Sequence, residues 1–140
     1  MSTLLFVYGT LRRRSRHPMA RKLARRAHFV GEATIAGRLY DLGRYPGLLE
    51  AAEPGDRVHG DVYDLGDDEA TLREMDAYEG VESPWPAYFD RQRASVRMGD
   101  GNDRAVWVYY FRGAVHDEQR IVSGRYDKNF FAEGEDPLAG

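Results

Sequence analysis

The 140-residue sequence contains no cysteine, which excludes disulfides, thiol chemistry and thiolate metal sites. It also lacks any apolar run near the roughly 20 residues that span a bilayer. The apolar segment at residues 3–8 is too short for a secretory signal peptide. We therefore expect a cytoplasmic protein.

Acidic residues are absent from the segment Arg12–Arg26, which contains eight basic residues. The whole chain has 20 basic residues, so the rest of the sequence contains 12 basic and 23 acidic residues. A nucleic-acid-binding arm and a solvated helix face both fit such a block. The net charge of -3 favours the helix face, and we expect no nucleic-acid partner.

Several catalytic and binding motifs are also missing. The four histidines are scattered and lack the close spacing of metal ligands, so we expect neither a metal nor another cofactor. No serine lies in a nucleophile elbow, and there is no phosphate-binding or dinucleotide-binding glycine motif. The aromatic run Trp107–Phe111 could stack on bases, but a buried strand is its more common setting.

The remaining pattern predicts one α+β domain over residues 1–131, with a frayed tail at 132–140. We expect strands at 3–8, 32–40, 57–65, 88–98 and 104–112. One helix should begin at Pro18, with Gly31 suited to its termination, and another should run from an N-cap at Asp67 to about Glu79, ended by Gly80. Pro46-Gly47 fits the centre of a type II turn, and residues 82–87 a loop. Regular strand–helix alternation is absent, so a mixed β-barrel-like body with flanking helices is the predicted fold.

Glu79 is unusual for its place on the second predicted helix. Leu72 and Met75 define an apolar stripe, and Glu79 falls on the same stripe at the helix C-terminus. Burial and the negative end of the helix dipole should both raise the pKa of this carboxyl, toward the range of a general base and acid. A frayed, solvated or ion-paired glutamate explains the spacing equally well. Asp76, at the edge of the stripe, is the next candidate, although a solvated helix position suits it better.

A series of short motifs follows the first predicted strand. In chain order they are Tyr8-Gly9-Thr10-Leu11-Arg12, Gly37-Arg38-Leu39-Tyr40-Asp41-Leu42-Gly43, Tyr45-Pro46-Gly47, Val58-His59-Gly60-Asp61-Val62-Tyr63, Met75-Asp76-Ala77-Tyr78-Glu79-Gly80, Val106-Trp107-Val108-Tyr109 and Ile121-Val122-Ser123-Gly124. Together they resemble the gamma-glutamylcyclotransferase-like family over most of residues 4–126. The ordered set is far more specific than any one motif.

The resemblance implies release of 5-oxoproline from a gamma-glutamyl amine or peptide, with Glu79 as the base and acid. It implies that Gly9 lets the backbone approach the substrate closely, and that peptide N–H groups there hold a carboxylate or oxyanion. Arg12 would add positive charge, although a surface role suits it equally. The substrate-binding residues that we predict are Tyr8, Gly9, Thr10, Leu11, Arg12, Tyr45, Gly47, Tyr88 and Tyr126.

Two features depart from the family pattern. Residues 81–87 form a longer segment than compact members have, and Tyr126 stands where bacterial relatives often have tryptophan. Both leave open which gamma-glutamyl compound is the substrate. A non-catalytic domain that binds a small carboxylate metabolite is the alternative function, and a homodimer is one option for the oligomeric state.

Overall fold

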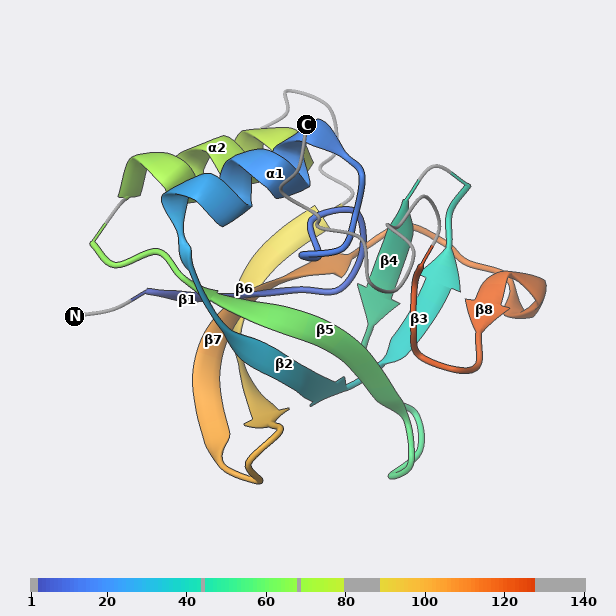
Figure 1. The fold of residues 1–140 in the computed structure, drawn as a ribbon. Helices are drawn as coiled ribbons and strands as arrows, with labels where there is room; N and C mark the ends of the chain where they lie inside the picture. Colours follow the sequence, from blue (N-terminus) through green and yellow to red (C-terminus); the bar gives the residue numbers. More distant parts are fainter. Residues whose placement is uncertain (1–2, 44, 68, 80–88, 128–140) are drawn as a thin grey trace.

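Five strands form a closed barrel, with a smaller sheet and two helices outside it (Figure 1). The computed structural model describes residues 3–43, 45–67, 69–79 and 89–127. For Tyr78 and Glu79 it describes only the backbone. The strand order is β1-β5-β2-β6-β7 in the barrel and β4-β3-β8 in the small sheet. The elements are β1 (Leu4–Val7), α1 (Pro18–Arg26), β2 (His28–Ala36), β3 (Arg38–Asp41), β4 (Pro46–Leu49), β5 (Arg57–Asp64), α2 (Glu69–Glu79), β6 (Phe89–Met98), β7 (Asp103–Phe111), the short 3₁₀ helix η1 (Asp117–Gln119) and β8 (Arg120–Ile121).

The first strand closes the barrel by pairing on both sides. It runs antiparallel to β5, where Leu5 pairs with Tyr63, and parallel to β7, where Leu5 pairs with Trp107. The other barrel pairs are antiparallel. The predicted α+β fold, a mixed barrel with flanking helices, is therefore confirmed.

Alternating side chains of the strands separate the apolar residues into two clusters. On β7, Val106, Val108 and Tyr110 belong to the cluster that also contains Phe6 of β1. The intervening Tyr109 belongs to a second cluster, with residues of both helices. Successive side chains of a strand point to opposite faces, so the first cluster fills the barrel and the second lies between its wall and the helices.

A glycine allows close approach inside the barrel. A Cβ atom at Gly60 on β5 would lie 2.7 Å from the ring Cε1 of Phe6 and would also meet the carbonyl oxygen of Val7. Gly60 thus stands on the inner face beside Val58 and Val62 and leaves room for the Phe6 ring.

The two helices lie side by side against one side of the barrel (Figure 1). Proline occupies the start of α1, and the imidazole Nδ1 of His17 accepts the N–H of Met19 at 3.1 Å as a cap. Glu74 of α2 forms ion pairs with Lys22 at 2.7 Å and Arg26 at 2.6 Å. Part of the basic segment is therefore used to join the helices.

Three local predictions were wrong. The strand expected at 32–40 is divided at Gly37 into β2 and β3. Gly31 does not end the first helix but lies within β2, at an irregularity in its pairing with β5. Pro46-Gly47 begins β4 and is paired with β3, because both residues pack against other parts of the chain.

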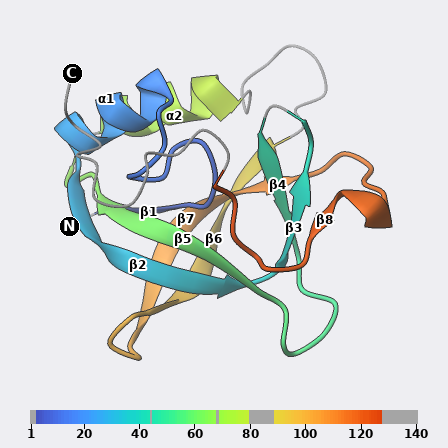
Figure 2. The same ribbon diagram turned by 45° about the vertical axis from the view of Figure 1, so that its right-hand side comes forward.

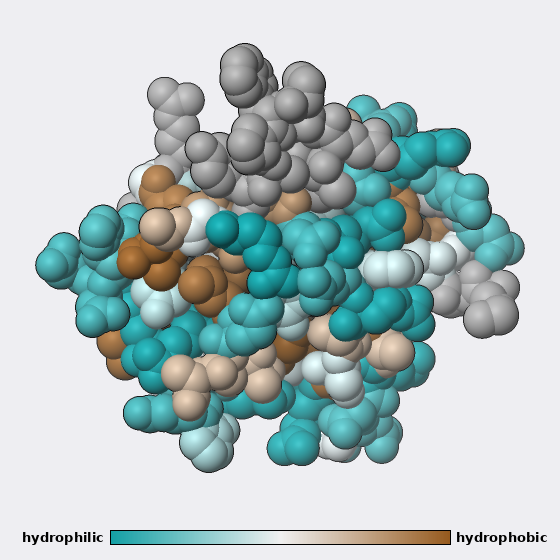
Figure 3. All heavy atoms as spheres, turned by 180° about the vertical axis from the view of Figure 1, so that it is seen from behind, coloured by the Kyte–Doolittle hydropathy of each residue, from teal (hydrophilic) through white to brown (hydrophobic). Residues whose placement is uncertain are grey.

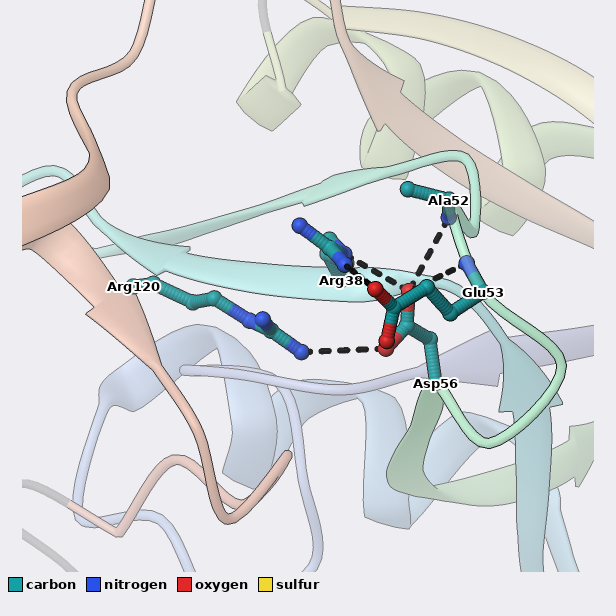
Figure 4. Close-up of polar contacts among 5 residues, drawn as sticks. All are labelled: Arg38, Ala52, Glu53, Asp56 and Arg120. Atoms are coloured by element: carbon teal, nitrogen blue, oxygen red, sulfur yellow. Dashed lines mark hydrogen bonds and ion pairs between the residues drawn. The ribbon is translucent and has the colours of Figure 1, made fainter.

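Asp56 ties the small sheet to the loop after β4 (Figure 4). One carboxylate oxygen accepts the Nε–H of Arg38 on β3 at 2.6 Å and the backbone N–H groups of Ala52 and Glu53, each at 2.9 Å. The other accepts Nη2 of Arg120 on β8 at 3.0 Å. The Arg38 hydrogen bond is the main reason that the pKa of the Asp56 carboxyl lies well below its usual value.

Replacement of Asp56 by Asn should therefore lower Tm at pH 7, and it should make Tm fall less steeply as the pH is lowered. The pKa of the Asp56 carboxyl in the folded protein lies below its value of about 3.9 in the unfolded chain. The stabilisation by Asp56 is therefore complete at pH values above about 3.9, and it is lost as the pH falls through the folded pKa. Thermal melts between pH 7 and pH 2 would measure it. Asp103→Asn, which alters an exposed pair with Arg97 at 3.7 Å, is the matched control. Equal melting curves for the two variants would contradict a structural role of Asp56.

Seen from behind, the described surface is largely hydrophilic, with apolar residues in small groups among polar ones (Figure 3). In the part of the chain that the structure describes, no helix has the length and apolar character needed to cross a membrane.

Candidate active site

The loop after β1 is fastened to two strands through its first residue. The buried hydroxyl of Tyr8 donates to the carbonyl oxygen of Tyr109 on β7 at 2.7 Å. The same hydroxyl accepts the N–H of Leu48 on β4 at 3.3 Å. The N–H of Arg12 donates to the carbonyl oxygen of Gly9 at 3.0 Å and closes the turn. The aromatic residue of the Tyr8-Gly9-Thr10 motif thus anchors the loop.

Strand β4 packs directly against this loop. A Cβ atom at Gly9 would collide with the ring of Pro46, with its Cδ at 2.7 Å. A Cβ atom at Gly47 would lie 2.8 Å from the Cβ of Phe111 on β7. Two of the predicted site residues, Gly9 and Gly47, are therefore brought together by the close packing of β4 between the loop and the end of β7.

An aromatic group borders the same strand. Tyr45, immediately before β4, is 42% exposed, and its ring meets that of Phe89 edge-on at a centroid distance of 5.7 Å. Phe89 in turn contacts Phe111 at 5.4 Å. Tyr45 thus offers an accessible aromatic side chain next to the Pro46–Gly9 contact.

Arg12 is directed to the outer wall of the barrel. Its Nη2 lies 3.1 Å from Asp61 of β5 and 3.5 Å from Glu32 of β2, and its side chain is only 11% exposed. Asp61 also accepts the backbone N–H of Arg13 at 2.8 Å. The guanidinium therefore neutralises Asp61 and fastens the far end of the Tyr8–Leu11 loop.

Tyr126 lies in the apolar cluster that fills the barrel, together with Phe6 and Tyr8. It is 3% exposed, so in this structure it packs in the core. Thr10 is half-buried and Leu11 buried, and Leu11 belongs to the cluster under the helices. Tyr88 and the segment 81–87 lie outside the described residues.

Glu79 is the last residue of α2. The end of α2 lies on the same side of the barrel as the loop after β1 and strand β4, in both Figure 1 and Figure 2. Of its predicted apolar stripe, Met75 is buried and Leu72 is half-buried. The side chain of Glu79 is outside the described part of the chain, so its position in a shared pocket stays a prediction.

Asp76 does not occupy the solvated position that the sequence favoured. It is 3% exposed, because α2 turns it toward the barrel wall. Arg91 of β6 donates to it through Nε at 2.7 Å and Nη2 at 3.1 Å, and the hydroxyl of Tyr109 donates at 2.7 Å. The sequence analysis missed Arg91 and Tyr109. The alternation of side chains along β7 could have indicated Tyr109, because it places this residue on the face opposite Val108.

Arg13 of the basic segment and the histidine His59 also have neighbours that the structure describes. Arg13 stacks on the ring of Phe29 at 4.9 Å. Desolvation, with help from Arg125 and Arg12, lowers the pKa of His59. Within the described ranges, no group of three or more His, Asp or Glu residues could hold a metal ion.

Comparison with known proteins shows the family of the chain. Residues 5–128 match the model of the family described as "Gamma-glutamyl cyclotransferase, AIG2-like". Two proteins whose names both begin with "Putative gamma-glutamylcyclotransferase" are similar to this chain. The one from Vibrio cholerae is 35% identical over 125 residues, which cover 89% of this chain and 95% of the relative. The one from Drosophila melanogaster is 29% identical over 121 residues, covering 80% and 71%.

A solved structure agrees in fold. The crystal structure of an AIG2-like protein from Mus musculus superimposes with a TM-score of 0.71 at 22% identity, covering 96% of this chain and 98% of that one. At this identity the superposition shows the fold alone, and the family model and the Vibrio relative show the family. The chain belongs to the gamma-glutamyl cyclotransferase, AIG2-like family.

Proposed function

We propose that this protein is an enzyme that releases 5-oxoproline from a gamma-glutamyl amine or peptide, with Glu79 as general base and acid. The observation that carries the proposal is the anchored loop: Tyr8 and Pro46 fix the turn at Gly9 on the side of the barrel where α2 ends. Family membership supplies the reaction type.

The chemistry is an intramolecular aminolysis. Glu79 takes a proton from the α-ammonium of the substrate, and the freed nitrogen attacks the γ-carbonyl carbon. The peptide N–H groups at Gly9, Thr10 and Leu11 would stabilise the oxyanion that forms. The bond to the leaving amine then breaks, and that amine takes the proton from Glu79. Such proton transfer by one positioned carboxylate contributes about 10²–10⁴-fold in rate.

The other predicted substrate-binding residues have different contacts, and we assign them different roles. Arg12 holds the loop through Asp61, and Tyr126 shares the apolar cluster of the barrel with Tyr8. Tyr45 is exposed beside Gly47 and is the described side chain best placed to contact the leaving group. Tyr88 keeps its substrate-binding assignment from the family resemblance.

A product assay tests the proposal. The full chain would be incubated with gamma-glutamyl dipeptides, tripeptides and the gamma-glutamyl-lysine isopeptide, and 5-oxoproline would be quantified by mass spectrometry. Heat-denatured protein corrects for spontaneous cyclisation. We expect catalytic release from at least one compound. Calorimetric binding of these compounds without any release would overturn the proposal in favour of a binding domain.

A further inference from the structure

A buried chain of hydrogen bonds connects α2 to the loop after β1. The hydroxyl of Tyr109 donates to Oδ1 of Asp76 at 2.7 Å. The carbonyl oxygen of the same Tyr109 accepts the hydroxyl of Tyr8 at 2.7 Å, and that hydroxyl accepts the N–H of Leu48 at 3.3 Å. One residue of β7 thus holds both the helix that ends in Glu79 and the loop of the proposed oxyanion site.

Among the described residues, Arg91 and the hydroxyl of Tyr109 hold the carboxylate of Asp76. Arg91 binds both oxygens, in the two-point geometry that fixes a carboxylate in direction as well as distance. The Arg91 guanidinium also lies 4.4 Å from the ring centroid of Trp107, which holds it from another side. The side chains of Asp76 and Arg91 are 4% and 23% exposed, so solvent screens this pair weakly.

These contacts argue against Asp76 as the base itself. Oδ1 accepts both Nε of Arg91 and the Tyr109 hydroxyl, and Oδ2 accepts Nη2 of Arg91. A carboxylate in that state would have to break an ion pair before it could take a proton from a substrate. These contacts hold the Asp76 carboxylate in place, so Asp76 is suited to anchor α2 to the barrel wall.

We propose that Asp76 is a positioning residue, which through Tyr109 sets the last turn of α2, and with it Glu79, against the Tyr8–Leu11 loop. Residues three apart on a helix have Cβ atoms about 5–6 Å apart, so fixing Asp76 fixes the backbone of the turn that ends at Glu79. The inference rests on the proposed function, in which Glu79 must reach a substrate held at the loop. A misplacement of about 1 Å can lower a rate by about 10²-fold.

The chain offers a matched control on the same helix. Glu74 also anchors α2 through two ion pairs, but toward Lys22 and Arg26 of α1 and away from β7. We expect Asp76→Asn to lower kcat about tenfold or more, with KM changed less than about threefold, because the loop still binds substrate. Tyr109→Phe should act in the same direction more weakly. Glu74→Gln should leave kcat within about twofold.

A double-mutant cycle distinguishes positioning from general loss of structure. If Asp76 acts through Glu79, Asp76→Asn should lower kcat in the wild-type background and have little effect in a Glu79→Gln background. Equal effects in both backgrounds would overturn the inference. Unchanged activity of Glu79→Gln alone would instead overturn the proposed function, so the two failures are distinct.

Amide hydrogen exchange gives a readout that needs no activity. Asp76→Asn and Tyr109→Phe should each speed exchange both at residues 76–79 and at residues 8–11, whereas Glu74→Gln should leave residues 8–11 unchanged. Faster exchange confined to α2 would show that Asp76 is not coupled to the loop, and would overturn the inference.

Discussion

Replacement of Glu79 by Gln is expected to lower turnover by about two to four orders of magnitude, the usual contribution of a general base. The amide is nearly isosteric with the carboxylate, so the packing of α2 through Met75 should persist. If the side chain of Glu79 is buried, as the apolar stripe predicts, a neutral group there can even leave the fold slightly more stable. The expected result is therefore lost turnover with an unchanged melt.

The measurement compares Tm and kcat in the same preparation of protein. Glu69→Gln is the control, because Glu69 is an exposed carboxylate in the first turn of the same helix. It should leave turnover unaltered and lower Tm only slightly, through its interaction with the helix dipole. Parallel loss of Tm and turnover would make Glu79 structural. Full turnover in the variant would assign the proton transfer to another residue.

Much of the fold follows from local patterns in the sequence. The alternation on β5, with Val58 and Val62 inward, and the turn at residues 99–102 between β6 and β7 could both be predicted, because each depends on neighbours in the chain. The start of α1 at Pro18 and the end of α2 at Glu79 also follow from rules about helix termini.

What the sequence could not indicate depends on distant partners. Pro46-Gly47 has the composition of a turn, yet contacts with Gly9 and Phe111 hold it in a strand. Asp76 lies at the edge of a helical stripe, and its burial depends on Arg91 and Tyr109, which are 15 and 33 residues away. Local propensity cannot report such contacts, because packing and ion pairing at long range override it.

Replacement of Gly9 by Ala is expected to reduce both stability and activity. The sequence suggested that this glycine leaves room for a ligand, whereas the structure shows the ring of Pro46 at that position, with Cδ 2.7 Å from the new Cβ. The loop or β4 must shift, at a cost of about 1–3 kcal/mol for an overpacked site. Displaced N–H donors should lower kcat by about a hundredfold. Thermal melts and the 5-oxoproline assay would measure the two effects.

The double variant Gly9→Ala with Pro46→Ala separates these two causes. Alanine at 46 removes Cγ and Cδ of the ring, and the nearest remaining atom, the Cβ at 46, lies 3.9 Å from the Cβ at position 9, an ordinary contact. Relative to Pro46→Ala alone, the added methyl group should then no longer lower Tm. Activity should recover to the level of Pro46→Ala as well, because the methyl group would occupy space that the Pro46 ring fills in the wild-type protein. Activity that stays low despite a restored Tm would show that a side chain at position 9 obstructs the ligand directly. Recovery of both Tm and activity would show that Gly9 is required only for packing against β4.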